Sequence, residues 1–76
     1  MRKQIYVAQF TNGIDRRSFP VLQPDIIFAA MAAQRWAPDV FKMRWNRVKD
    51  PSKLKIVILA PDGRRHEEPA QISSGW

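Results

Sequence analysis

The chain has no cysteine, one histidine and three glycines among its 76 residues. Without cysteine it can form neither a disulfide nor a thiolate metal site, which excludes a disulfide-stapled secreted domain and favours a reducing compartment. No apolar run approaches the roughly 20 residues that cross a bilayer, and no apolar signal-peptide segment follows the basic start. We therefore expect a soluble cytoplasmic protein with no membrane partner.

Groups that carry catalysis or bind metals are also scarce. The single histidine, His66, stands beside Glu67 and Glu68, but adjacent residues on a strand point to opposite faces. No second histidine lies at ligand spacing. The aspartates fall in turns and at helix ends, and the sequence has no glycine-rich phosphate loop and no serine-nucleophile motif. The sequence therefore predicts no enzyme, no cofactor and no metal site.

Length and charge indicate one small basic domain. We expect a single domain over residues 1–69 and a flexible tail over residues 70–76, which show no periodicity. The 13 Lys and Arg residues against 7 Asp and Glu give a net charge of +6. Such an excess attracts anionic partners. Because the basic residues are spread along the chain rather than gathered in a tail, folded elements should carry the positive surface.

Two strand-like segments begin the chain. Residues 4–11 alternate in the period-2 pattern of a half-buried strand, and residues 14–21 follow as its partner. Asn12-Gly13 between them predicts a two-residue type I′ turn, because both central positions need positive φ. That turn would pair Phe10 with Asp15. One face of the hairpin, the core side, then carries Tyr6, Ala8, Phe10 and Phe19.

Residues 24–38 read as the only helix. Pro24 fits the first turn, Asp25 complements the positive helix start, and Pro38 is expected to end the helix. The helix is apolar on two sides, and only one of them can pack on the sheet. One side gathers Ile26 with Ala29, Ala30, Ala33 and Ala37, and the other gathers Ile27, Phe28 and Met31.

Two orientations of this helix remain open. If the large residues face the sheet they bury more apolar area, and this favours the first orientation, with the alanines outside. If the alanines face the sheet, the large residues form a patch for a protein partner, and a second copy of the chain could pair there or at an edge strand. Trp36, near the helix end, can anchor a partner or cap the core. The interface candidates are Ile27, Phe28, Met31, Arg35 and Trp36.

Three further strand-like segments follow the helix. Residues 40–48 alternate, and we prefer a strand there because a helix would spread their charges around its surface. Residues 54–60 are rich in β-branched side chains, which is typical of a central strand. Residues 64–68 predict a short polar edge strand that ends before Pro69.

These elements predict a two-layer α+β domain in which one helix lies across a mainly antiparallel sheet. The order is β-β-α-β-β, with room for one more strand. No second layer is left for the other sheet face, which must be solvated or covered by a partner. The expected core consists of Tyr6, Phe10, Phe19, Phe41, Met43, Trp45, Ile56 and Ile58.

The basic residues form the candidate binding surface. On a strand, Lys42 and Arg44 would be about 7 Å apart, comparable with phosphate spacing, and Arg16 should share their sheet face. The alternative is that these charges only solvate the sheet. We expect no stacking of bases, because the aromatic residues fall on the core side. The candidates for binding nucleic acid or a nucleoprotein complex are Arg16, Arg17, Lys42, Arg44, Arg47, Lys49, Lys53, Arg64 and Arg65.

In size, lack of cysteine and hairpin-helix-hairpin order, the chain resembles the small accessory proteins encoded by bacteriophages and mobile elements, among them some anti-CRISPR proteins. The resemblance implies a non-enzymatic inhibitor or adaptor that binds and blocks a host complex. It covers the general layout only, so no motif residue carries over. Many of those proteins are acidic, whereas this chain is at +6, which favours an acidic protein surface or nucleic acid as the target.

Overall fold

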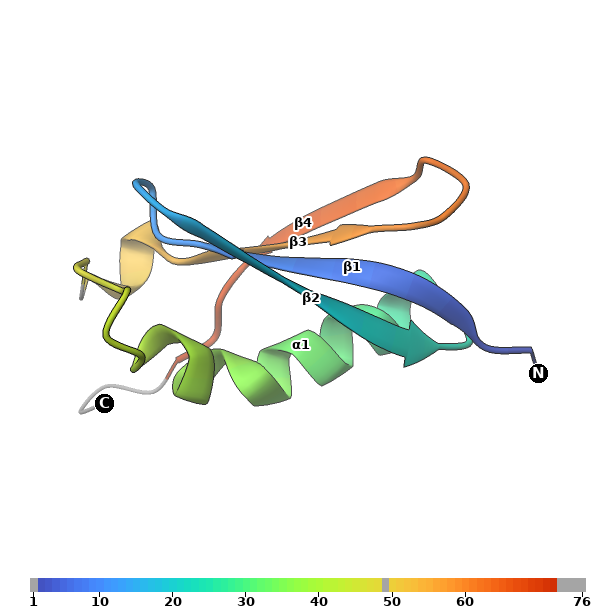
Figure 1. The fold of residues 1–76 in the computed structure, drawn as a ribbon, viewed down its shortest axis with the longest axis horizontal. Helices are drawn as coiled ribbons and strands as arrows, with labels where there is room; N and C mark the ends of the chain where they lie inside the picture. The colour runs from blue at the N-terminus through green and yellow to red at the C-terminus, as the bar shows by residue number, and fades with distance from the viewer. Residues whose placement is uncertain (1, 49, 73–76) are drawn as a thin grey trace.

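The computed structural model describes residues 2–48 and 50–72, and within these residues a four-stranded antiparallel sheet is covered on one face by one helix (Figure 1). This is the expected two-layer α+β fold in the order β-β-α-β-β. In the same residues no helix is long and apolar enough to cross a membrane. The elements are β1 (Gln4–Thr11), β2 (Arg16–Gln23), α1 (Ile26–Phe41), the 3-10 helix η1 (Pro51–Lys53), β3 (Lys55–Leu59) and β4 (Arg65–Pro69).

The strand order in the sheet is β2-β1-β3-β4, and each neighbouring pair is antiparallel. The apolar strand β3 is central and the polar strand β4 is an edge, so the predictions for residues 54–60 and 64–68 are confirmed. Pro69 is the last residue of β4 instead of following it. Beyond β4, the N–H of Ala70 donates to the carbonyl oxygen of Leu54 at 3.0 Å, and residues 73–76 of the predicted tail lie outside the described residues.

The predicted two-residue turn between β1 and β2 is wrong. Phe10 pairs with Arg17 instead of Asp15, so the connection is longer than Asn12-Gly13 alone. The reason is local, because the side-chain oxygen of Asn12 accepts hydrogen bonds from the N–H groups of Ile14 and Asp15 at 2.9 and 2.6 Å. The register shift is even, so the same residues still face the core.

The helix begins two residues later than predicted, so Pro24 precedes its N-cap instead of lying in its first turn, and it ends later than expected. Asp25 is its N-cap and accepts a hydrogen bond from the N–H of Phe28 at 3.0 Å. Pro38 lies inside the helix instead of ending it. In the last turn its missing N–H costs a single bond. Continuing the helix past Pro38 buries Val40 and Phe41, one turn beyond Ala37 on the same face.

The strand predicted over residues 40–48 is therefore wrong. Its first two residues belong to α1, and residues 42–48 form turns and loop. Met43 is 44% exposed and lies outside the core, whereas Trp45 is half-buried against Phe41, with ring centroids 6.3 Å apart. Without the strand, the expected stripe of Lys42 and Arg44 on a sheet face does not form.

The alanine side of α1 faces the sheet, so the orientation favoured by buried area is wrong. Alanine lets the helix backbone approach the sheet closely, and large side chains from the strands then fill the layer between them. Ile27, Phe28 and Met31 point outward with 57%, 45% and 50% of their surface exposed. The buried helix residues include Ala29, Ala30, Ala33 and Ala37.

The rest of the core largely follows the prediction. Phe10 lies at its centre, with its ring edge-to-face to those of Phe19 and Phe41 at centroid distances of 5.8 Å. Phe19 is only partly buried. Among the predicted core residues, those fully buried are Tyr6, Phe10, Phe41, Ile56 and Ile58.

Candidate nucleic-acid interface

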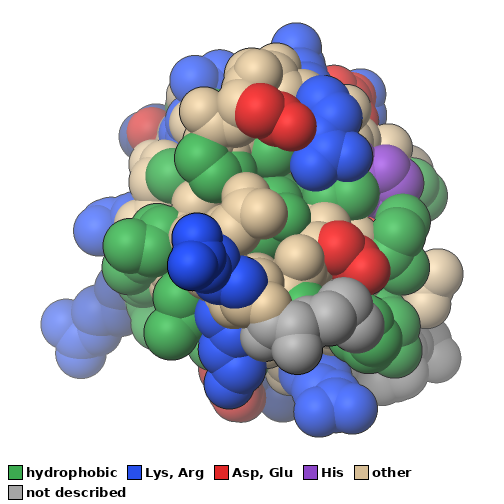
Figure 2. Space-filling view, turned by 90° about the vertical axis from the view of Figure 1, so that its right-hand side faces the viewer, with side chains coloured by type: hydrophobic (Ala, Val, Ile, Leu, Met, Phe, Trp, Pro, Cys, Tyr) green, Lys and Arg blue, Asp and Glu red, His purple; other side chains and the backbone are tan. Residues whose placement is uncertain are grey.

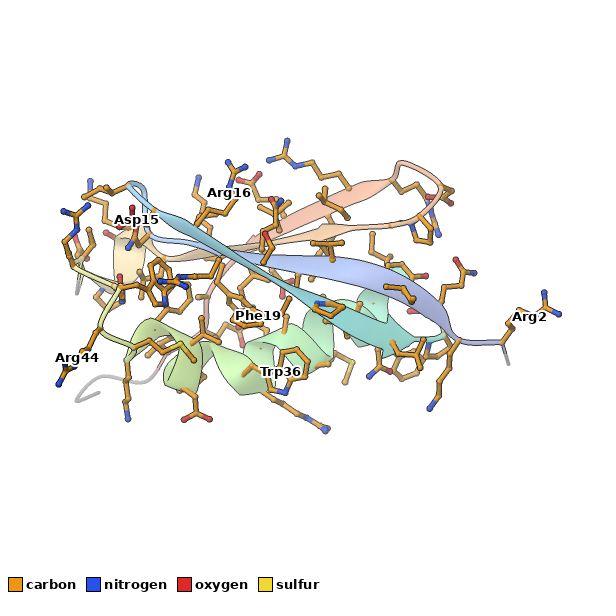
Figure 3. The ribbon with its side chains drawn as sticks, viewed as in Figure 1. Arg2, Asp15, Arg16, Phe19, Trp36 and Arg44 are labelled. Carbon is orange, nitrogen blue, oxygen red and sulfur yellow. The ribbon has the colours of Figure 1, made fainter. Side chains whose placement is uncertain are left out.

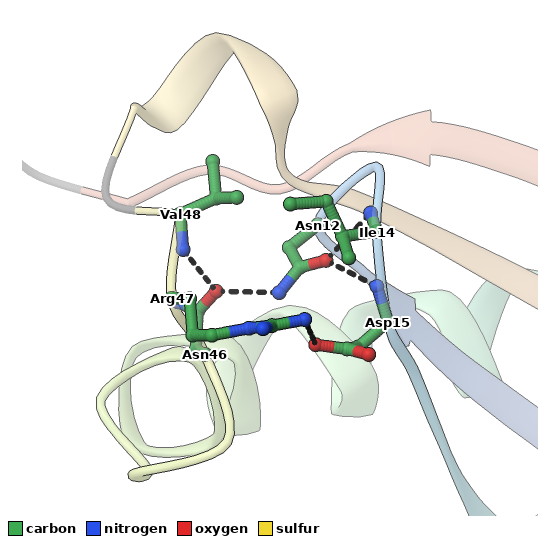
Figure 4. A network of polar contacts seen from close by, with 6 residues as sticks. All are labelled: Asn12, Ile14, Asp15, Asn46, Arg47 and Val48. Carbon is green, nitrogen blue, oxygen red and sulfur yellow. Dashed lines mark hydrogen bonds and ion pairs between the residues drawn. The ribbon is translucent and has the colours of Figure 1, made fainter.

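A buried pair of asparagine side chains joins the β1–β2 loop to the segment that follows α1 (Figure 4). Asn12 Nδ2 donates to Asn46 Oδ1 at 2.8 Å, and Asn46 Nδ2 donates to the carbonyl oxygen of Phe41. The two residues are 0% and 3% exposed. An amide buried to this extent is costly unless it is hydrogen-bonded, so the pair holds the two segments in one arrangement.

This Asn12–Asn46 pair brings four arginines to one end of the molecule. Arg16 and Arg17 follow the β1–β2 loop, and Arg44 and Arg47 lie on either side of Asn46. Figure 3 shows Asp15, Arg16 and Arg44 at this end. The four arginines, which we call the arginine cluster, line a hollow of about 530 Å³ together with Asp15 and Trp45.

The hollow that the arginine cluster lines, which we call the arginine hollow, is strongly cationic. Its one carboxylate, Asp15, lies 3.3 Å from the guanidinium of Arg47, and both side chains are well exposed. Among the described residues, Arg16, Arg17 and Arg44 have no ion-pair partner. Guanidinium groups present paired N–H donors that match the oxygens of a phosphate. The hollow can therefore bind an anion that carries several oxygen acceptors.

An aromatic ring also lies in this hollow. The guanidinium carbon of Arg17 is 5.3 Å from the centroid of the Trp45 ring, within the range of a cation–π contact. The sequence predicted no aromatic residue beside the basic surface, because it placed Trp45 on the core side of a strand. The loop that replaces that strand leaves Trp45 half-buried at the arginine cluster.

A second hollow, of about 410 Å³, lies on the sheet face that α1 does not cover. We call it the sheet hollow. Lys55 and Arg65 line it from β3 and β4, and both pair with Glu67, at 3.5 and 2.8 Å. Asp15 and Arg16 line both hollows. The two cationic hollows therefore adjoin at the edge of β2.

The remaining predicted basic residues lie elsewhere. Lys42 and Lys53 are exposed and line neither hollow, and Lys49 lies outside the described residues. Arg64 is in the β3–β4 turn at the opposite end of the sheet (Figure 1), where it pairs with Asp62 at 2.7 Å. The N–H of Arg64 donates to the Asp62 carboxylate and holds its pKa below the usual value.

The interface candidates on α1 all reach the surface, but they do not form one site: four of them line two separate hollows, and Phe28 lines neither. Ile27, Met31 and Arg35 line a hollow of about 370 Å³ between α1 and β4. Trp36 lines another of about 310 Å³ with Phe19, and Figure 3 shows these two rings near each other. Viewed from the end where α1 begins, hydrophobic side chains reach the surface between Lys and Arg side chains (Figure 2).

Polar contacts between α1 and β4 have a structural role. Gln34 Nε2 donates to Glu68 Oε1 at 2.7 Å and to the carbonyl oxygen of Pro69 at 3.0 Å. Burial raises the pKa of Glu68, but hydrogen bonds from His66 and Gln34 outweigh it, so the pKa lies below the usual value. Within the described residues, no group of three or more His, Cys, Asp and Glu could hold a metal ion.

Sequence reasoning missed three parts of this site. The sequence predicts Asn12 only as a turn residue, and its partner Asn46 is 34 positions away, beyond the reach of any local pattern. It also predicts Trp45 on the core side of a strand. Lys55 is not among the predicted binding residues, although Ile56 is predicted for the core and adjacent strand residues point to opposite faces, which places Lys55 on the outer sheet face.

In comparisons with known proteins, no family model matches this chain, and no curated protein or solved structure is significantly similar to it. Its function therefore has to be argued from the geometry and chemistry of the site.

The Asn12–Asn46 pair can be tested by a double-mutant cycle. We expect Asn12→Ala and Asn46→Ala each to lower the free energy of unfolding by about 2–3 kcal/mol, because each leaves a buried amide without its partner. The double variant should lose about 1–2 kcal/mol less than the sum, since no amide is then left unpaired. Urea unfolding measures all four proteins. Additive losses would show that the two side chains do not stabilise each other.

Proposed function

We propose that the protein is a small non-enzymatic binding protein that engages the phosphates of nucleic acid, free or in a nucleoprotein complex, through the arginine cluster. One observation carries the proposal. Arg16, Arg17, Arg44 and Arg47 come from two distant segments, line one hollow, and have a single carboxylate among them. Several basic side chains together contact a phosphate backbone in nucleic-acid complexes, whereas a surface that is only solvated does not need its arginines to converge.

The chemistry of the hollow supports this choice of ligand. The pair between Asp15 and Arg47 is exposed, so it contributes little and leaves Arg47 able to exchange its partner for a phosphate. The net charge of +6 would speed encounters with a polyanion. Arg16 and Arg44 have no described partner to give up. The site is therefore prepared for an anion without breaking a strong internal contact.

Salt dependence tests the proposal. We expect log K for oligonucleotide binding to fall linearly with log salt, because bound phosphates release counterions. Replacing two contacting residues, in Arg16→Gln/Arg44→Gln, should lower the slope by about 1.4–1.8, for single strands and duplexes respectively. Fluorescence anisotropy with labelled oligonucleotides at several salt concentrations measures the slope.

The matched control is Arg2→Gln/Lys3→Gln. It removes the same charge from the exposed residues before β1, at the end of the molecule opposite the arginine cluster (Figure 3). This control should bind almost like the unaltered protein. Equal weakening by both double variants would show that binding depends on net charge alone. No binding near micromolar concentration at low salt would refute the proposal.

A second function is favoured by the outer surface of α1. Ile27, Phe28 and Met31 are about half exposed, and side chains of this size seldom lie together on a surface that contacts nothing. The alternative is a protein-binding inhibitor or adaptor of the phage accessory type, which blocks a host complex through this surface and the basic sheet.

The outer surface of α1 can be tested separately from the core. We expect Phe28→Gln/Met31→Gln to abolish capture of a protein partner from a cell lysate while changing the free energy of unfolding by less than about 1 kcal/mol. Ala33→Leu, on the buried side, should cost about 1–3 kcal/mol through overpacking. Mass spectrometry identifies captured proteins and urea unfolding measures stability. Unchanged capture by the double variant would exclude this surface.

A further inference from the structure

The arginine hollow and the sheet hollow lie on opposite faces of the sheet. Arg16 and Arg17 are consecutive on β2, so their side chains point to opposite faces. In Figure 3, Arg16 rises on the side away from α1, whereas Arg44 lies at the level of α1. Because Arg16 lines both hollows, and the Asp15 carboxylate that it shares them with is paired with Arg47, the positive surface passes from one face to the other around the edge of β2.

The sheet hollow extends this surface across the strands. Thr11 of β1 pairs with Arg16 of β2 on one side and with Lys55 of β3 on the other. Arg16 and Lys55 therefore lie two strand spacings, or about 10 Å, apart. Thr11 and Gln9 line the same hollow and add a hydroxyl and an amide. Lys55 keeps one exposed contact, to Glu67, which also has Arg65 as a partner. The ammonium group of Lys55 can therefore bind a phosphate in addition to Glu67.

The edge of β2 is poorly suited to another kind of ligand, an added β-strand. Pro20 lies within β2 and has no N–H to donate to a neighbouring strand. An extended peptide pairing along this edge would therefore meet a gap in the row of donors. The charged side chains at the start of β2 remain the feature that a ligand at this edge can use.

We infer that the ligand of this surface is single-stranded nucleic acid, whose backbone bends around the edge of β2 from the arginine hollow into the sheet hollow. The inference rests on the proposed function and narrows it. A duplex is stiff over about 150 base pairs and cannot follow so sharp a turn, whereas a single strand can. The Arg17–Trp45 contact also provides a surface on which an unpaired base can stack.

The test compares a labelled 12-nucleotide single strand without self-complementarity with its duplex, at low salt. We expect the single strand to bind about tenfold more tightly, within the range that one stacked base supplies. Lys55→Gln should lower the salt slope for the single strand by about 0.7, because one phosphate contact is lost. Lys53→Gln is the matched control, since it removes an equal charge from a nearby residue that lines neither hollow.

The outcomes separate the path around β2 from the proposed binding of nucleic acid by the arginine cluster. Equal or tighter binding of the duplex, or equal slopes for the Lys53 and Lys55 variants, would overturn the path around β2 and leave nucleic-acid binding by the arginine cluster standing. Binding of neither oligonucleotide would overturn both. Tighter binding of the single strand with a slope change confined to Lys55→Gln would support the path.

Discussion

The hydrogen bond between the buried side chains of Asn12 and Asn46 is the contact on which the arrangement of the arginine cluster depends. Neither the β1–β2 loop nor residues 42–48 belong to a helix or strand that would fix their relative position. The two amides supply that constraint, because burying either without its partner would cost more than the bond itself contributes. The same amides also bond to the backbone of both segments, so one contact sets the shape of each loop and the distance between them.

The helix α1 carries small residues on the side that faces the sheet and large apolar residues on its outer side, and this arrangement determines which residues are available for binding. Alanines toward the sheet let the two layers approach closely, and aromatic side chains from the strands fill the core between them. The large apolar residues in the first part of the helix, Ile27, Phe28 and Met31, are then left outside, toward the end of the molecule opposite the arginine cluster (Figure 1). The two candidate surfaces use different residues, so each can be altered without disturbing the other.

Local patterns in the sequence predict most of the fold and little of the site. The alternation in β1, the β-branched residues of β3 and the charge of β4 identify those strands, and the register error at Asn12 is harmless because it is even. The strand predicted after Pro38 is wrong, because Val40 and Phe41 fit the alternation of a strand and also fit the next turn of the buried helix face. Once that segment is loop, its arginines are placed by the long-range contact of Asn46, which no local pattern contains.

The most direct measurement is a nitrogen–proton NMR titration of the labelled protein with a short oligonucleotide. The proposed role predicts that the backbone signals of Arg16, Arg17 and residues 44–47 shift, together with the indole N–H of Trp45, while the indole N–H of Trp36 stays in place. Shifts centred on Trp36 and on residues 27–31, with the arginine cluster unchanged, would contradict it.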